Sequence, residues 1–151
     1  MRTKRKKKVR LENKAKIRRR LLRLWKEKVR WGWKNQCGVC GRKDKELLPN
    51  GKLAILNCHH IESERNQVTR YDPVNGILLC PSHHKFGKES FHRSAVWSMA
   101  WLKKFHPWIL SLVERKRMMA APDLNDREVL ARIEEALKRR RKGRGLPLGK
   151  A

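Results

Sequence analysis

Three stretches of the chain place apolar residues at the three- and four-residue spacing of a helix that is buried along one side. The first runs from about Leu11 to Gly32, and its apolar residues, set among Arg and Lys, are Leu21, Leu22, Leu24, Trp25 and Val29. The second begins near Ser94 and carries an aromatic stripe of Trp97, Trp101, Phe105 and Trp108. Pro107 should break or kink this second helix. The third follows a stretch that resembles a capping box at 125–128, and its apolar face comprises Val129, Leu130, Ile133 and Leu137.

The middle of the chain has the pattern of short strands and turns. The apolar run 53–58 predicts one strand and Ile77–Leu79 a second, with a polar loop over 62–72 between them. Residues 47–51 form a loop whose Asn-Gly pair is typical of a turn, and Asp-Pro-Val-Asn-Gly at 72–76 predicts another. A helix should begin near Pro81, because proline is tolerated in a first turn. The pattern therefore predicts an α+β fold.

Charge is the dominant feature of the composition. The 151 residues hold 40 Lys and Arg against 14 Asp and Glu, for a formal charge of +26. Residues 1–34 alone carry net +15, whereas 35–113 carry only net +5. A chain this basic repels itself unless a polyanion neutralises it, so we expect DNA, with RNA as an alternative, and binding that weakens with salt. Residues 1–10 and the tail from Arg139 should be disordered or frayed.

The chain has no long apolar segment and no apolar signal core after its basic N-terminus, so we expect no membrane association and a cytoplasmic location. That location would include the nucleoid, or a host cytoplasm if the protein is phage-encoded. In a reducing compartment, four cysteines indicate metal ligands more than disulfides. The oligomeric state stays open.

Two Cys/His pairs have the spacing of a structural zinc site. Cys37-x-x-Cys40 matches one half of a tetrahedral zinc site, and Cys80-x-x-His83 matches the other half. A core of about 80 residues is near the size at which a bound structural metal adds needed stability. The alternative is four unrelated side chains, which the matched spacing disfavours. Cys58 is a fifth candidate, and we interpret it as a small buried apolar residue.

Four further polar residues lie in the same stretch and exceed what a zinc clip needs. They are His59, His60, Asn75 and His84. His59 and His84 could bind a catalytic divalent cation while His60 accepts a proton. Alternatively, the His59–His60 pair is incidental to a zinc ribbon. The residues alone leave both interpretations open.

In order along the chain, Cys37-x-x-Cys40, His59-His60-Ile61, Asn75 and Leu79-Cys80-x-x-His83-His84 resemble the HNH nuclease family over roughly residues 35–92. The resemblance implies a small ββα-metal core stapled by zinc, here flanked by basic N- and C-terminal helices. It divides the chain into a basic tail and helix (1–34), the nuclease core (35–92), a Trp-rich helical extension (93–118) and a C-terminal helix with a basic tail (119–151). A weaker resemblance, carried by 90–95 and the Trp-rich helix, is to phage-encoded recombination nucleases of the NinG type.

The resemblance also implies roles for single residues. His60 would be the general base, oriented by Asn75, and His59 and His84 would bind the catalytic ion, Mg²⁺ or Mn²⁺. The chain departs from the family in having Cys-x-x-His as its second knuckle. It also has Lys88 where some members have a further histidine, which leaves His92 as a candidate third ligand.

Several basic residues are candidates for contacts with nucleic acid. They are Arg18, Arg19, Arg20, Arg23 and Lys26 on the first helix, Arg65 and Arg70 in the loop between the strands, and Lys88. For any one of them, a solvated basic face is the alternative. The leading interpretation is a metal-dependent DNA endonuclease. The others are a non-catalytic zinc-knuckle protein that binds nucleic acid, and a nuclease selective for branched recombination intermediates.

Overall fold

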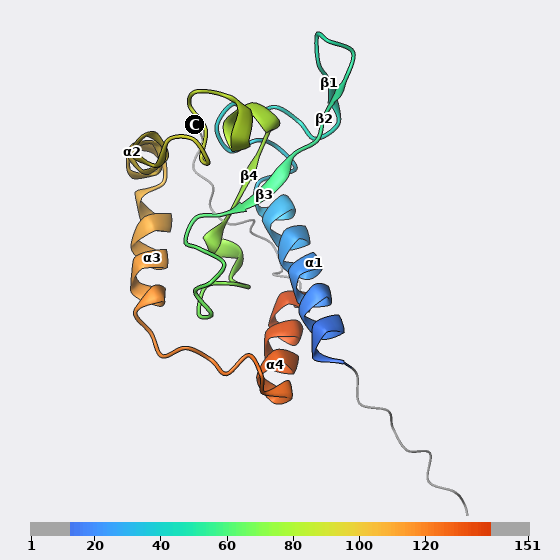
Figure 1. Cartoon of the computed structure of the whole chain (residues 1–151), viewed down its shortest axis with the longest axis vertical. Coiled ribbons are helices and arrows are strands. Elements are labelled where there is room, and N and C mark those ends of the chain that lie inside the picture. The colour runs from blue at the N-terminus through green and yellow to red at the C-terminus, as the bar shows by residue number, and fades with distance from the viewer. Residues whose placement is uncertain (1–12, 140–151) are drawn as a thin grey trace, which may run out of the picture.

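The computed structural model describes residues 13–139, and the predicted behaviour of residues 1–10 and of the tail after Arg139 lies outside this range. The described chain is a mixed helix and strand structure, as the α+β prediction requires (Figure 1). Its helices are α1 (Lys14–Gly32), α2 (Ala95–Phe105), α3 (Pro107–Arg117) and α4 (Arg127–Lys138), with short helical turns η1 (Pro73–Asn75) and η2 (Ser82–Phe86). Its strands are β1 (Glu46–Leu47), β2 (Leu53–Ala54), β3 (Asn57–His60) and β4 (Gly76–Leu79).

The strands form two separate antiparallel pairs, β1 with β2 and β3 with β4. The β3–β4 register places His59 opposite Ile77 and His60 opposite Gly76. The strand predicted over 53–58 is therefore wrong in extent, because two strands, β2 and β3, cover this region. β1 was predicted as part of a loop. The Asn-Gly turn is confirmed, since Gly51 adopts a positive φ of 75° between β1 and β2.

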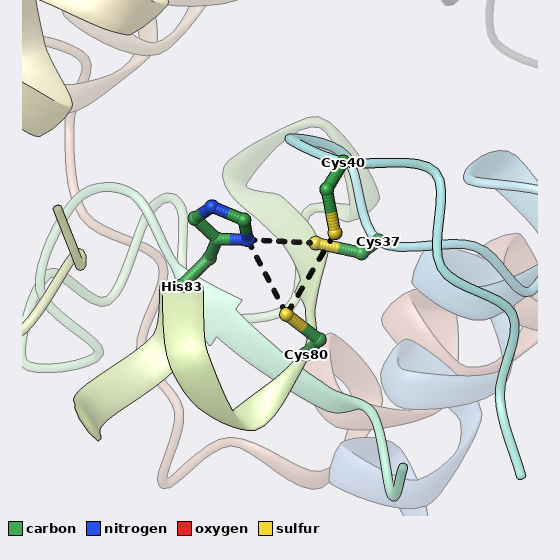
Figure 2. Close-up of side chains that lie close together, drawn as sticks. All are labelled: Cys37, Cys40, Cys80 and His83. Carbon is green, nitrogen blue, oxygen red and sulfur yellow. Dashed lines mark hydrogen bonds between the residues drawn. The ribbon is translucent and has the colours of Figure 1, made fainter. Parts of the chain in front are cut away.

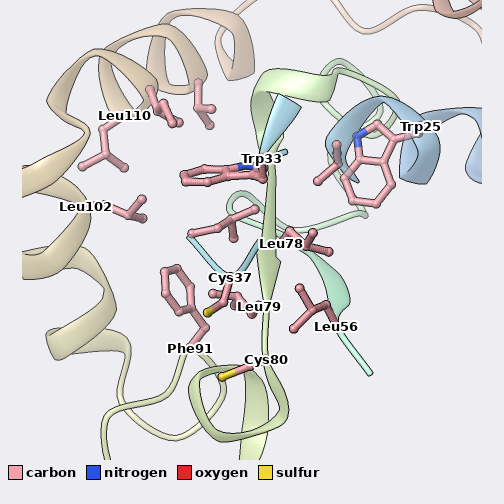
Figure 3. Packing of buried hydrophobic residues seen from close by; sticks show 14 residues of the cluster. Trp25, Trp33, Cys37, Leu56, Leu78, Leu79, Cys80, Phe91, Leu102 and Leu110 are labelled. Atoms are coloured by element: carbon pink, nitrogen blue, oxygen red, sulfur yellow. The ribbon is translucent and has the colours of Figure 1, made fainter. Parts of the chain in front are cut away.

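α1 packs against both halves of the molecule. Its buried residues Ile17, Leu21, Trp25 and Val29 are spaced by four, which confirms the predicted apolar face. Trp25 and Val29 join the larger hydrophobic core with β4, α2 and α3 (Figure 3). Ile17 and Leu21 join a smaller core with α4. The helix ends at Gly32, as predicted.

The C-terminal helices begin where the local sequence dictates. The Ser94 side chain accepts a hydrogen bond from the Trp97 amide and caps α2, and the Asp126 side chain caps α4 by accepting from the Glu128 amide. Pro107 ends the aromatic helix as predicted and opens α3. Among residues 13–139, no helix is both long and apolar enough to cross a lipid bilayer.

A close approach between α1 and β4 determines the position of the site. A Cβ on Gly76 would lie 2.2 Å from Val29 Cγ2 and 2.9 Å from Trp25 Cζ2. Only glycine therefore lets the helix pack this closely on the strand. The result is that Trp25 lies beside the end of β3, where the His59–His60 pair is found.

Candidate metal centres and the adjacent histidine

The four predicted zinc ligands lie together at one end of the larger core. Cys37 and Cys40 come from a knuckle loop, and Cys80 and His83 come from the end of β4 and from η2 (Figure 2). Their ligand atoms all lie within 4.8 Å of one another. The two halves are held in place by a backbone hydrogen bond of 2.8 Å from the Gly38 amide to the Leu78 carbonyl.

The spacing of these atoms matches a tetrahedral zinc site. His83 Nδ1 is 3.3 Å from Cys80 Sγ and 3.7 Å from Cys37 Sγ, and the Cys40 and Cys80 sulfurs are 3.9 Å apart. Zinc bonds of about 2.3 Å to sulfur and 2.0–2.1 Å to nitrogen place tetrahedral ligand atoms about 3.5–3.8 Å apart. The cluster can therefore hold a metal such as zinc with little rearrangement.

The thiols already favour metal binding. A hydrogen bond with Cys80 lowers the pKa of the Cys37 thiol to about 4. The same bond raises the pKa of Cys80, and burial raises the pKa of Cys40. A cation bound by these sulfurs would displace the thiol protons. Cys58 is not part of this Cys/His cluster, and burial raises the pKa of its thiol to about 11.

A second cluster consists of three histidines, His59, His84 and His92, whose ligand nitrogens also lie within 4.8 Å of one another. The Nε2 atoms of His84 and His92 are 3.2 Å apart. Burial lowers the pKa of His59 to about 4 and lowers that of His84. These two imidazoles are therefore neutral at pH 7 and offer lone pairs to a cation.

His92 reaches this cluster because η2 is short. The helix predicted near Pro81 is a single wide turn, closed by a 2.8 Å hydrogen bond from the Gly87 amide to the Ser82 carbonyl. The chain then turns back, and the His92 amide donates to the His84 carbonyl at 3.1 Å. The sequence left His92 as a candidate ligand, and the structure brings it to His59 and His84.

His60 points away from these three rings and is held from two sides. Its ring stacks on Trp25, with centroids 3.9 Å apart and planes 4° from parallel. Its Nε2 lies 2.9 Å from the Arg70 carbonyl oxygen. A carbonyl only accepts, so the proton is on Nε2 and the lone pair is on Nδ1. Burial lowers the pKa of His60, with the charges of Arg70 and Lys26 acting in the same direction.

Asn75 supports this arrangement indirectly, since the structure gives it no hydrogen bond to His60. It is buried, and its side chain donates to the carbonyls of Glu62 and Thr69 at 3.0 and 3.2 Å and accepts from the Glu62 amide at 2.6 Å. These bonds close the loop that contains Arg70, whose carbonyl fixes His60. The effect of Asn75 on His60 is thus transmitted through the loop.

The predicted nucleic-acid contacts fall into two groups. Arg18 and Arg20 are engaged within the protein: Arg18 donates to the Leu124 carbonyl and to Asn125, and Arg20 forms a two-pronged pair with Glu134 at 3.0 and 2.7 Å. Arg23 lies 3.4 Å from Glu27 on the exposed surface. Among the remaining candidates, Arg70 is half-buried beside Tyr71. The exposed ones are Arg19, Lys26, Arg65 and Lys88.

Sequence reasoning missed Trp25 as a neighbour of His60. It recognised Trp25 only as part of an apolar helix face, and no local signal links that face to a residue 35 positions later. No family model, curated protein or solved structure matches this chain. Its function must therefore be inferred from the geometry of the two clusters and of His60.

Proposed function

We propose that this protein is a metal-dependent endonuclease of the HNH type that hydrolyses phosphodiester bonds in DNA. The observation that supports this most is the state of His60, which follows a histidine of the three-imidazole cluster. Its Nε2 proton is engaged by a carbonyl, and its Nδ1 has no hydrogen-bond partner among residues 13–139. A module that only binds nucleic acid needs no such oriented imidazole.

In this proposal the two clusters have different tasks. Cys37, Cys40, Cys80 and His83 hold a structural zinc ion that staples the knuckle loop to β4. β3, β4 and η2 make up the ββα-metal unit, with the basic helix α1 and the C-terminal helix α4, whose charges balance, on its flanks. His59, His84 and His92 hold a divalent cation, which when bound stabilises negative charge on the scissile phosphate and the leaving oxygen.

His60 is the general base in this proposal. Its Nδ1 lone pair takes a proton from the attacking water, a role that suits a neutral imidazole at pH 7. The ring then carries a positive charge while it faces the indole of Trp25, and a cation over an aromatic face is stabilised. The Arg70 carbonyl and Trp25 together keep the ring from rotating, and Asn75 holds the loop that carries this carbonyl.

The basic residues near this site, all exposed except the half-buried Arg70, would bind the phosphate backbone. Lys26 and Arg70 lie close enough to His60 for their charges to lower its pKa. Arg19, Arg23 and Lys26 recur at helical spacing along the exposed side of α1, and Arg65 and Lys88 lie in the flanking loops. Such contacts position DNA without reading its sequence.

The test is a cleavage assay on plasmid DNA and on branched oligonucleotides, with and without Mg²⁺ or Mn²⁺. We expect nicking or cutting only when a divalent cation is present. Cleavage confined to branched substrates would identify the nuclease as one for recombination intermediates. DNA or RNA binding without any cleavage, by zinc-loaded protein, would contradict the proposal and favour the non-catalytic zinc-knuckle protein.

A further inference from the structure

The β1–β2 hairpin extends from the body of the molecule (Figure 1). It also presents an apolar face to solvent. Leu47 and Leu53 are directly opposite each other in the strand register, so their side chains lie on the same face. They are 68% and 52% exposed, and Ile55, two residues after Leu53, is 50% exposed. Apolar side chains grouped in this way on a surface indicate a contact with a partner.

This face continues toward the candidate active site. From Leu53 to Asn57 the odd-numbered residues are exposed, whereas Ala54 and Leu56 are fully buried. The alternating burial of residues 53–57 indicates that the chain stays extended between β2 and β3, and the same alternation continued into β3 places the half-buried His59 on the side of Leu53 and Ile55. At about 3.3 Å per residue, Ile55 is roughly 13 Å and Leu53 roughly 20 Å from His59 along the chain. A ligand held at His59 would reach the apolar face within a few nucleotides.

The charges around the hairpin indicate which partner it contacts. Its acidic residues are engaged within the protein, Asp44 with Arg30 at 2.7 Å and Glu46 with Arg42 at 3.6 Å. Its lysines, by contrast, are exposed and form no ion pair with any residue between 13 and 139; they are Lys43, Lys45 and Lys52. An apolar face flanked by free cations is complementary to a surface that combines stacked apolar rings with anionic groups, which is the surface of DNA.

We propose that the hairpin face formed by Leu47, Leu53 and Ile55 is a wedge that enters the DNA minor groove and separates adjacent base pairs beside the cleavage site. Apolar side chains inserted at a base step unstack it and kink the duplex, and the lysines would hold the phosphates on either side. The choice of DNA rests on the proposed function, but insertion itself needs no catalysis. Insertion would also favour substrates that are already unstacked, such as branched junctions.

The experiment measures unwinding of plasmid DNA that is relaxed by a topoisomerase requiring no divalent cation, in the presence of the His60→Ala protein. We expect the bound protein to shift the recovered topoisomers, because unstacking unwinds the duplex. In the same background, Leu47→Thr/Leu53→Thr should lose most of the shift while affinity for DNA falls by no more than several-fold. Threonine keeps a high strand propensity, which protects the hairpin. Ile55→Thr provides a second, milder variant.

The matched control changes two exposed apolar residues elsewhere. Val96→Thr/Met118→Thr alters side chains that are 85% and 80% exposed on α2 and at the end of α3, and it should keep the full shift. If the His60→Ala protein, which is the parent of these variants, binds DNA without unwinding it, the wedge is excluded while the nuclease proposal stands. The same holds if the hairpin variant unwinds DNA as well as this parent does. Absence of DNA binding by the parent would overturn both. Loss of a dimer in the hairpin variant, with unwinding unchanged, would make the face a contact between copies of the chain.

Discussion

The indole of Trp25 and the imidazole of His60 are stacked 3.9 Å apart and almost parallel. Trp25 is fully buried and is itself fixed, because its Nε1 donates to the Asp72 carbonyl at 2.8 Å. The imidazole is therefore oriented by a residue of the basic N-terminal helix. In the proposed nuclease, α1 therefore orients the general base in addition to making the DNA contacts expected of its charge.

The first prediction tests that task. Trp25→Phe keeps an aromatic face beside His60 and should retain most of the cleavage rate, whereas Trp25→Leu frees the imidazole. Since general base catalysis contributes about 10²–10⁴-fold, we expect Trp25→Leu to lose at least 10-fold in kcat. The loss should appear in kcat with KM for DNA nearly unchanged, as measured by steady-state cleavage of a labelled oligonucleotide.

Trp33→Leu is the matched control for this comparison. Trp33 belongs to the same core and its Nε1 also donates to a backbone carbonyl, that of Gly76 at 2.9 Å, but its ring does not stack on His60. Zinc content and circular dichroism should be checked for each variant. Equal losses of kcat in the two leucine variants would show that packing alone is responsible.

The second prediction concerns the zinc site. Purified protein should contain one tightly bound zinc per chain, and Cys40→Ala should lose the metal, part of its secondary structure and all cleavage. Structural zinc in small domains is coupled to folding, and binding contributes about 10–16 kcal/mol in peptides at pH 7. Elemental analysis and circular dichroism provide the measurement. His60→Ala serves as the control, since it should keep both metal and fold, and active protein without zinc would rule the site out.

The third prediction distinguishes the catalytic ion. Three imidazole ligands suit Mn²⁺, Co²⁺ or Ni²⁺ better than Mg²⁺, which prefers oxygen ligands. Cleavage should therefore reach half its maximal rate at a lower concentration of Mn²⁺ than of Mg²⁺. His92→Ala should raise the required Mn²⁺ concentration about 10-fold or more, while His106→Ala, a buried histidine outside the cluster, should not. An unchanged requirement in His92→Ala would limit the ligands to His59 and His84.

The fourth prediction concerns Arg20, which the sequence suggested as a DNA contact. Hydrogen bonds from Arg20, followed by that from Lys138, lower the pKa of the Glu134 carboxyl from 4.5 to about 2. Glu134 is therefore ionised in the folded protein, and the pair stabilises the α1–α4 contact above pH 4.5 and loses this effect as the pH falls toward 2. Arg20→Gln should lower the free energy of unfolding by about 1–3 kcal/mol at pH 7.

Urea unfolding from pH 7 to pH 3 tests this prediction, because the difference between the wild type and Glu134→Gln should shrink as the pH decreases. The neighbouring Arg19, which is exposed, supplies the contrast. Arg19→Gln should leave stability unchanged and weaken DNA binding. If Arg20→Gln instead weakens binding with no effect on unfolding, Arg20 is a DNA contact after all.

Several features could be predicted from the sequence because they depend on local spacing. The pairs Cys37–Cys40 and Cys80–His83 form one cluster, and Pro107 ends α2 where the proline rule places the break. Within each pair the two ligands are three residues apart, and Pro107 lies two residues after the end of α2, so each signal is local. Such signals depend on backbone geometry that does not change with tertiary context.

Other features depend on contacts between distant segments. The stacking of Trp25 on His60 requires the close approach of α1 to Gly76, which no local pattern encodes. Arg20 and Glu134 pair across 114 residues of sequence, from α1 to α4, so both side chains resemble ordinary surface charges in the sequence. His92 joins His84 only because η2 ends after one turn, whereas the sequence predicted a helix without indicating its length.

The most direct test of the nuclease proposal compares wild-type protein with His60→Ala on supercoiled plasmid in the presence of Mn²⁺. His60→Ala should cut at least about 10²-fold more slowly. Its zinc content and its affinity for DNA, measured by fluorescence anisotropy, should match those of the wild type. Cleavage by His60→Ala at the wild-type rate would contradict the assignment of His60 as the base and, with it, the proposed mechanism.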